Sequence, residues 1–94
     1  MNQSICVGID VSKDTLELAW AGSANTQVFA NQEQGFAALV ASLAIHNVAL
    51  VVMETTGGYE QGCALALAGA HLPVSVVNPG QARDFARATG RLAK

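Results

Sequence analysis

The spacing of the hydrophobic residues changes twice along the chain, and these changes restrict the fold more than any other feature. Apolar residues alternate with others over residues 5–11, which predicts a strand. Residues 15–21 and 26–30 predict two more strands, and the short turns between the three favour antiparallel hairpins. From Phe36 the apolar residues recur at helical spacing, and residues 48–53 form a continuous apolar run typical of a strand buried on both faces.

The second half of the chain continues this alternation of helices and strands. A helix is expected over residues 59–70, a strand over 73–77 and a last helix after Asn78. Asn31 is expected to cap the first helix, with Gln34 three residues later as in a capping box. The order β-β-β-α-β-α-β-α predicts an α/β fold with a mixed five-stranded sheet flanked by helices. It resembles the RNase H-like topology, which implies the strand order 3-2-1-4-5 with strands 1–3 antiparallel.

Composition places the chain among small globular proteins. Its 94 residues are 51% hydrophobic, which excludes a disordered segment, and only 13% charged, which indicates that part of the surface is covered by another chain or further sequence. No apolar run reaches the ~18 residues of a membrane span, and the N-terminus lacks the basic segment of a signal peptide. Cys6 and Cys63 lie in apolar surroundings and are expected to be reduced thiols. A cytoplasmic protein without a membrane partner is therefore expected.

The net charge of −2 conceals an asymmetry along the sequence. Lys13 is the only lysine or arginine in residues 1–78, which contain six acids. Residues 79–94 reverse this balance and place basic side chains on one face of the expected last helix. That face indicates phosphate binding, although a merely solvated helix face fits it equally well. The residues concerned are Arg83, Arg87, Arg91 and Lys94.

Two acids come at the ends of expected strands, Asp10 at the end of the first and Glu54 after the fourth. If these strands are parallel neighbours, both carboxylates emerge at the sheet edge where ligands of open α/β sheets bind. Facing carboxylates repel each other unless a cation lies between them, and oxygen ligands suit Mg²⁺ or Mn²⁺. Such a site can activate the attacking oxygen and stabilise the leaving oxygen of a phosphodiester displacement. Asp10 and Glu54 are therefore candidate catalytic and metal-binding residues.

Spacing alone fits a simpler explanation slightly better. Asp10 would then begin a turn and Glu54 would cap the next helix, since acids are common at strand ends. Gly57 and Gly58 permit a tight backbone where that helix begins. Tyr59, close to Glu54, fits a substrate contact and, more readily, packing.

Three segments together resemble one family of proteins. Residues 7–16 (VGIDVSKDTL), 53–60 (METTGGYE) and 77–86 (VNPGQARDFA) are similar, in order and spacing, to motifs of the DEDD-type insertion-sequence transposases. These have a RuvC-like N-terminal domain and a separate C-terminal domain, and pilin-gene invertases belong to the same group. The similarity extends over essentially the whole chain.

This resemblance implies DNA transposition or site-specific recombination, in which a metal-dependent transposase binds DNA and cleaves and joins its strands. Asp10 matches the first catalytic acid of the family and Glu54 the second, with Mg²⁺ or Mn²⁺ as cofactor. Two further aspartates of the family follow a G-x-x-A-K segment, which residues 90–94 match. Residues 1–94 are therefore expected to be the N-terminal part of one RuvC-like catalytic domain, truncated at its C-terminus and inactive alone.

The resemblance also implies partners. These are DNA, a guide (bridge) RNA from the end of the mobile element, and further copies of the protein in a homo-oligomer. Lys13, three residues after Asp10, becomes a candidate nucleic-acid contact together with the four basic residues of the last helix.

Two other functions remain open from the residues themselves. An actin-like ATPase fragment also carries G-I-D followed by small polar residues, although its phosphate loop is usually richer in glycine and threonine than residues 11–13. A non-catalytic nucleic-acid-binding or assembly module would bind DNA or RNA without needing Asp10 or Glu54.

Overall fold

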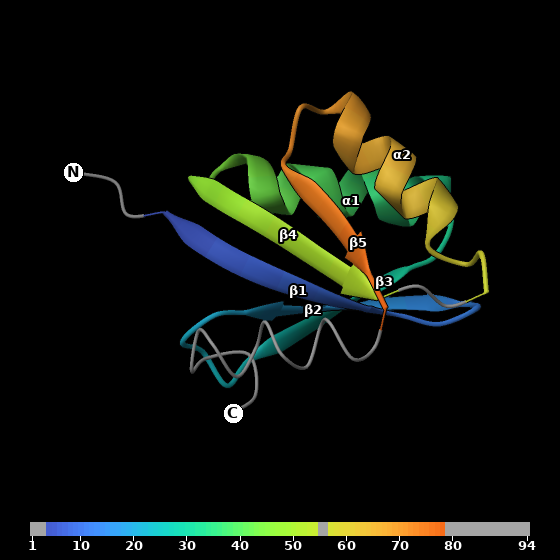
Figure 1. Cartoon of the computed structure of the whole chain (residues 1–94), viewed down its shortest axis with the longest axis horizontal. Coiled ribbons are helices and arrows are strands. Elements are labelled where there is room, and N and C mark those ends of the chain that lie inside the picture. Colours follow the sequence, from blue (N-terminus) through green and yellow to red (C-terminus); the bar gives the residue numbers. More distant parts are fainter. Residues whose placement is uncertain (1–3, 55–56, 79–94) are drawn as a thin grey trace.

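Five strands and two helices follow one another in the residues that the computed structural model describes, 4–54 and 57–78 (Figure 1). The predicted succession is confirmed as far as the fifth strand, and the expected last helix lies outside the described residues. The elements are β1 (Ile5–Val11), β2 (Thr15–Trp20), β3 (Thr26–Ala30), α1 (Glu33–Ala44), β4 (Val48–Glu54), α2 (Gln61–Gly69) and β5 (Val74–Val77).

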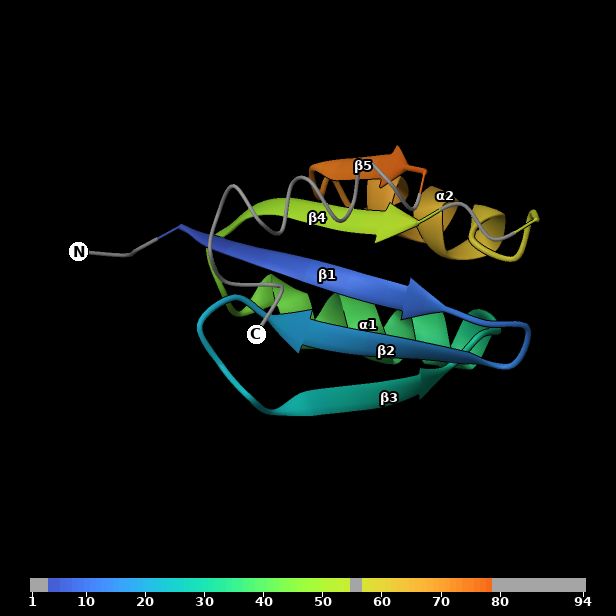
Figure 2. The same cartoon turned by 60° about the horizontal axis from the view of Figure 1, so that its bottom comes forward.

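The strand β1 is the centre of the sheet, whose order is β3-β2-β1-β4-β5. β2 pairs antiparallel with both β1 and β3, because tight turns join these strands, whereas β4 pairs parallel with β1 and β5 parallel with β4. Parallel neighbours need a crossover connection, which α1 supplies between β3 and β4 and α2 between β4 and β5. Figure 2 shows β1 between β2 and β4. The predicted strand order is confirmed.

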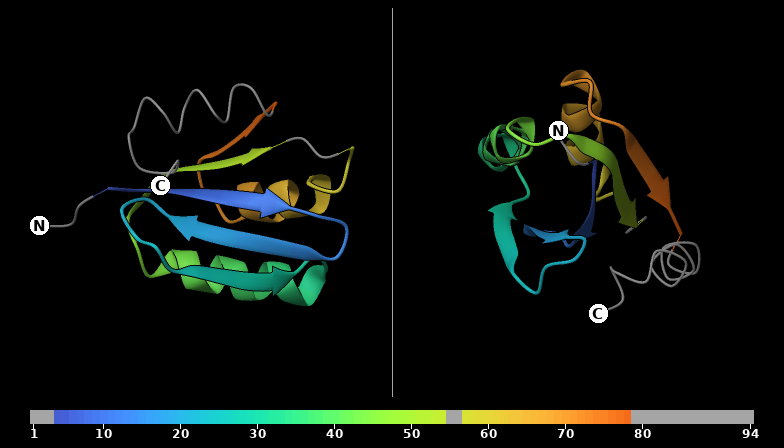
Figure 3. Two further views of the ribbon diagram at one scale, coloured as in Figure 1. Left: turned by 90° about the horizontal axis from the view of Figure 1, so that it is seen from below. Right: turned by 90° about the vertical axis from the view of Figure 1, so that its left-hand side faces the viewer.

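Both helices lie on one face of the sheet (Figure 3). Successive side chains of a strand point to opposite faces, so alternate residues of β1 enter the core beneath the helices. The other face of β1 carries Cys6, Gly8 and Asp10, and neither α1 nor α2 covers it. The core consists of Val7, Ile9, Val11, Leu16, Leu18, Leu39, Leu43, Val51, Met53, Cys63 and Leu67.

The starts of both helices differ from the prediction. The N-cap of α1 is Gln32, and no side chain caps this helix. Asn31, the predicted N-cap, forms tertiary hydrogen bonds instead. The helix α2 begins two residues later than predicted, because Gly57 and Gly58 adopt φ angles of 72° and 104° and the chain turns before the helix starts. Positive φ angles of this kind suit glycine, which has no Cβ to clash with the backbone.

The two helices are short and lie close against the sheet. Gly35, in the first turn of α1, is buried, and a Cβ at this position would collide with the carbonyl oxygen of Ala30. The absence of a side chain therefore lets α1 start directly beside the end of β3. Within the described residues, no helix is long and apolar enough to cross a membrane.

Candidate active site

Asp10 and Glu54 lie at the carboxyl ends of neighbouring parallel strands. The pairing of β1 with β4 runs in register as far as Ile9 and Met53, and the two acids are the next residues along. Neighbouring strands lie about 4.8 Å apart. The predicted placement of Asp10 and Glu54 at one edge of the sheet is therefore confirmed, because both lie at the carboxyl ends of adjacent parallel strands.

Both acids belong to the sheet face that α1 and α2 leave uncovered. Ile9 and Val11 point into the core, so Asp10 between them points the other way and is exposed. Glu54 is half-buried and follows the buried Met53. Within the described part of the chain, no basic side chain pairs with either carboxylate. Both carboxylates are therefore without a basic partner on this face of the sheet, as far as the described residues show.

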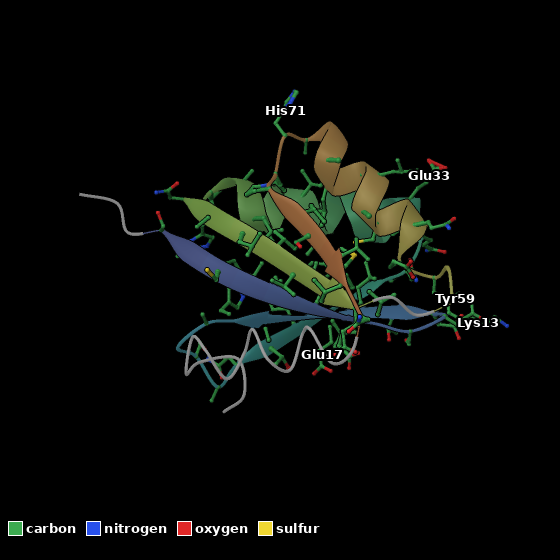
Figure 4. All side chains as sticks on the ribbon, in the orientation of Figure 1. Lys13, Glu17, Glu33, Tyr59 and His71 are labelled. Atoms are coloured by element: carbon green, nitrogen blue, oxygen red, sulfur yellow. The ribbon has the colours of Figure 1, made fainter. Side chains whose placement is uncertain are left out.

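A third acid, Glu17 of β2, lies directly across from Asp10, and no sequence motif had singled it out. The register of the hairpin pairs Asp10 with Glu17, and Figure 4 shows Glu17 pointing away from the helices. The short turn between β1 and β2, residues 12–14, was the signal that could have revealed this pair, because turn length fixes the register. The described residues contain no group of three acids, histidines or cysteines placed to hold a metal ion. Glu17 thus adds negative charge beside Asp10 without completing a set of ligands.

The turn that follows Asp10 is held by its own side chains. Oγ of Ser12 lies 2.8 Å from Oγ1 of Thr15 and accepts a hydrogen bond of 3.2 Å from the Thr15 backbone N–H. Lys13 is exposed in this turn, and Figure 4 shows it at the carboxyl end of β1. Its ammonium group is therefore presented to solvent at the edge where the two acids emerge.

The loop that follows Glu54 lies beside this turn. Nδ2 of Asn31 donates one hydrogen bond to the carbonyl oxygen of Ser12 (2.8 Å) and another to that of Tyr59 (3.0 Å). Figure 4 shows Lys13 and Tyr59 at the same end of the molecule. Tyr59 is 49% exposed, so its side chain is not part of the core and about half of it faces solvent at the carboxyl edge.

The two cysteines have different environments, and both are free thiols. Cys6 is half-buried on the same face as Asp10, whereas Cys63 of α2 is buried in the core. Burial raises the pKa of the Cys63 thiol to about 11. A thiol that stays protonated at neutral pH is a poor nucleophile and a poor metal ligand.

The predicted basic residues Arg83, Arg87, Arg91 and Lys94 lie outside the described residues.

The arrangement of the sheet and its edge is that of an RNase H-like protein. RuvC from T. thermophilus, solved in complex with a Holliday junction substrate, is similar with a TM-score of 0.64 and 17% sequence identity. The match covers 87% of this chain and 69% of the RuvC chain. At this level of identity the similarity establishes the fold, and it confirms the predicted RuvC-like topology.

The chain belongs to the DEDD transposase family of the IS110 type, whose model, described as a transposase, matches residues 7–94. The match contains Asp10, Glu54 and all three segments on which the resemblance was based. The chain is therefore a catalytic domain of DNA transposition and recombination, and neither the ATPase nor the non-catalytic module is favoured. A comparison with curated proteins found no match.

Proposed function

We propose that Asp10 and Glu54 bind a divalent cation, Mg²⁺ or Mn²⁺, with which this transposase cleaves and joins DNA strands. The observation that carries this proposal is the placement of two carboxylates on adjacent parallel strands, at their carboxyl ends and on the open face of the sheet. Carboxylate oxygens are the ligands that these cations prefer. The donor set therefore fits the cation. Within the described residues, no basic side chain competes with the cation for these carboxylates.

The residues at the carboxyl edge of the sheet have different functions in this proposal. A bound cation would polarise the phosphodiester and activate the attacking oxygen. The carboxylates of Asp10 and Glu54 hold the cation, and the β1–β4 pairing sets the spacing of the strands that carry them. The charge of Glu17, next to Asp10, adds to the negative potential that attracts the cation. Lys13 is exposed and lies three residues after Asp10, so its ammonium group can contact a phosphate of the bound DNA strand.

We further propose that DNA lies along this edge, with Lys13 and the basic residues Arg83, Arg87, Arg91 and Lys94 as phosphate contacts. The structure of RuvC, which has a similar fold, was solved with a Holliday junction substrate, and this supports DNA binding by the present chain. Resemblance to the family supports a guide RNA, a homo-oligomer, a cytoplasmic site of action, and residues 1–94 as the N-terminal part of the catalytic domain. The low charged fraction of 13% agrees with a surface that a partner covers.

The test replaces each acid by its uncharged isostere, Asp10→Asn and Glu54→Gln, in the full-length transposase. We expect cleavage of element-end DNA to fall by more than about 100-fold, because losing a direct ligand costs more than losing an outer-shell partner, which costs about 10–100-fold. Binding of Mn²⁺, measured by electron paramagnetic resonance, is expected to weaken in the same variants. This second measurement separates a loss of metal from a loss of DNA binding.

The matched control is Glu33→Gln, which removes one carboxylate on α1. Figure 4 shows Glu33 on the helix side of the sheet, so Mn²⁺ binding and cleavage are expected to match those of the unmodified protein. Folded Asp10→Asn and Glu54→Gln proteins that cleave DNA at the unmodified rate would show that the two acids have no catalytic role.

A further inference from the structure

The side chain of Asn31 connects the turn that follows β1 with Tyr59, which lies five residues after Glu54 along the chain. Its Nδ2 donates to the carbonyl oxygen of Ser12, two residues after Asp10, at 2.8 Å. The same nitrogen donates to the carbonyl oxygen of Tyr59, in the loop that follows Glu54, at 3.0 Å. One amide group therefore joins the turn after β1 to the loop after β4.

The backbone fixes Asn31 in place for this contact. Its N–H donates to the carbonyl oxygen of Asp14 at 2.9 Å, so Asn31 is bonded to both sides of the β1–β2 turn. The turn itself is held by the contacts between Ser12 and Thr15. The connection thus runs from a rigid turn, through Asn31, to the loop that contains Tyr59.

This connection lies just beyond the last paired residues of β1 and β4. The paired register of β1 and β4 ends at Ile9 and Met53, one residue before the acids. Asp10 is paired on its other side with β2, and Glu54 with β5. Beyond the last β1–β4 pair, the bonds of Asn31 are a direct link between the two chain segments within the described residues.

The chemistry of the link requires the amide of asparagine. Two carbonyl oxygens can be satisfied by the two N–H groups of one amide nitrogen, and a carboxylate or a hydroxyl cannot supply both. The Asn31 amide does not cap α1, because the N-cap of that helix is Gln32 and no side chain caps it. Asn31 therefore contributes to the edge of the sheet and not to the helix start.

We propose that Asn31 is a positioning residue of the active site, which sets the relative placement of Asp10 and Glu54 by joining the segments that follow them. This inference rests on the proposed function of the two acids as metal ligands. A cation with a demanding coordination geometry needs its carboxylates held within a fraction of an ångström. Asn31 supplies that constraint at the point where the β1–β4 pairing no longer does.

The test is Asn31→Ala in the full-length protein, with Mn²⁺ binding followed by electron paramagnetic resonance. The dissociation constant is expected to rise about 10-fold, the typical effect of removing an outer-shell partner. Amide hydrogen exchange of residues 12–15 and 57–60 is expected to accelerate together, because both segments lose the same link. Cleavage activity is expected to fall and to recover as the Mn²⁺ concentration is raised, which a purely structural defect would not allow.

A second variant, Asn31→Asp, keeps the shape of the side chain, removes both donors and adds a negative charge. It is expected to weaken Mn²⁺ binding as Asn31→Ala does. Tighter binding would overturn the proposal, because local charge and not the link would then govern the site. The matched control is Asn47→Ala, at the opposite end of β4, where only the backbone carbonyl bonds to β1. It is expected to bind Mn²⁺ like the unmodified protein.

Measuring Asp10→Asn in parallel separates the two levels of the inference. If Asp10→Asn weakens Mn²⁺ binding and Asn31→Ala does not, Asn31 has no positioning role while the proposed function stands. If neither variant changes Mn²⁺ binding, the proposed function fails and the role of Asn31 fails with it.

Discussion

His71 shows how a single residue can adopt a conformation that its side chain disfavours. It lies just after the C-cap of α2 with φ at 64°. Its N–H donates to the Ala68 carbonyl at 2.9 Å, and the next N–H, of Leu72, donates to the Leu67 carbonyl at 3.0 Å. This is the Schellman arrangement, in which the left-handed position is usually glycine. The conformation is imposed by the two hydrogen bonds and by Leu72, which packs against the core.

Replacing this residue by glycine is expected to stabilise the protein. His71→Gly removes a Cβ from a left-handed position, which should raise the free energy of unfolding by about 0.5–1 kcal/mol after the greater freedom of the unfolded glycine is counted. His71 is exposed, and Figure 4 shows it beyond the end of α2, so little packing is lost. Urea denaturation measures the change. The control is His46→Gly, which should destabilise the protein because the His46 ring lies 4.7 Å from that of Trp20.

The buried thiol of Cys63 predicts a loss of stability at alkaline pH. Its pKa is raised from 9.0 to about 11 by burial, so the folded state keeps a proton that the unfolded state releases above about pH 9. The stabilising contribution is full below pH 9 and declines as pH rises to 11, by roughly 2 kcal/mol. Urea denaturation at pH 8 and pH 10.5 measures it. Cys63→Ala should show a smaller decline, and an equal decline in both proteins would contradict the prediction.

At the scale of secondary structure elements, the first turn of α1 lies directly against the end of β3. The contact exists because Gly35 leaves room for the carbonyl group of Ala30. It places the first turn of α1 directly after Asn31, whose amide joins the two edge loops. The docking of one helix thus contributes to the geometry of the candidate active site on the other face of the sheet.

Adding one methyl group at this contact is expected to be costly. Gly35→Ala forces α1 away from β3, and overpacking of this kind costs about 1–3 kcal/mol, with more where the obstacle is backbone. The same substitution at Gly69, the last residue of α2, meets no atom within 4 Å. Gly69→Ala should therefore be neutral or stabilising by up to about 1 kcal/mol. Thermal denaturation of the two variants tests the difference, and equal melting temperatures would contradict it.

At the scale of the whole molecule, the helices and the candidate active site occupy opposite sides of one sheet. The core under α1 and α2 determines which face of β1 is buried, and the alternation of side chains then leaves Asp10 on the other face. The parallel pairing of β1 and β4 brings Glu54 beside it. Core and site are therefore two consequences of the same strand register.

Several features of the fold and of the candidate active site could be predicted from the sequence. The alternation of residues 5–11, the apolar run of residues 48–53 and the turns between strands are local patterns, and they determined the type and order of the elements. Asp10 and Glu54 could be singled out because each stands at the end of such a pattern. The family resemblance then indicated the topology that makes them neighbours, and the strand order agrees.

The roles of Asn31, Glu17 and Tyr59 could not be predicted in the same way. Asn31 has the residue type of a helix cap, but its partners lie 19 and 28 residues away in the sequence. Glu17 reads as an ordinary exposed residue of a strand until the hairpin register places it opposite Asp10. Tyr59 has the character of a core residue, and its exposure follows from the turn that the two glycines make before α2.

The sequence by itself thus determined the elements, their order and the two acids, because hydrophobic periodicity and turn chemistry act over a few neighbouring residues. Only the tertiary structure decided that Asp10 and Glu54 share one edge and one face, and that Asn31 joins the segments behind them. The physical reason is that strand pairing and side-chain hydrogen bonds depend on which distant segments meet. Burial of the common core beneath α1 and α2 settles that choice.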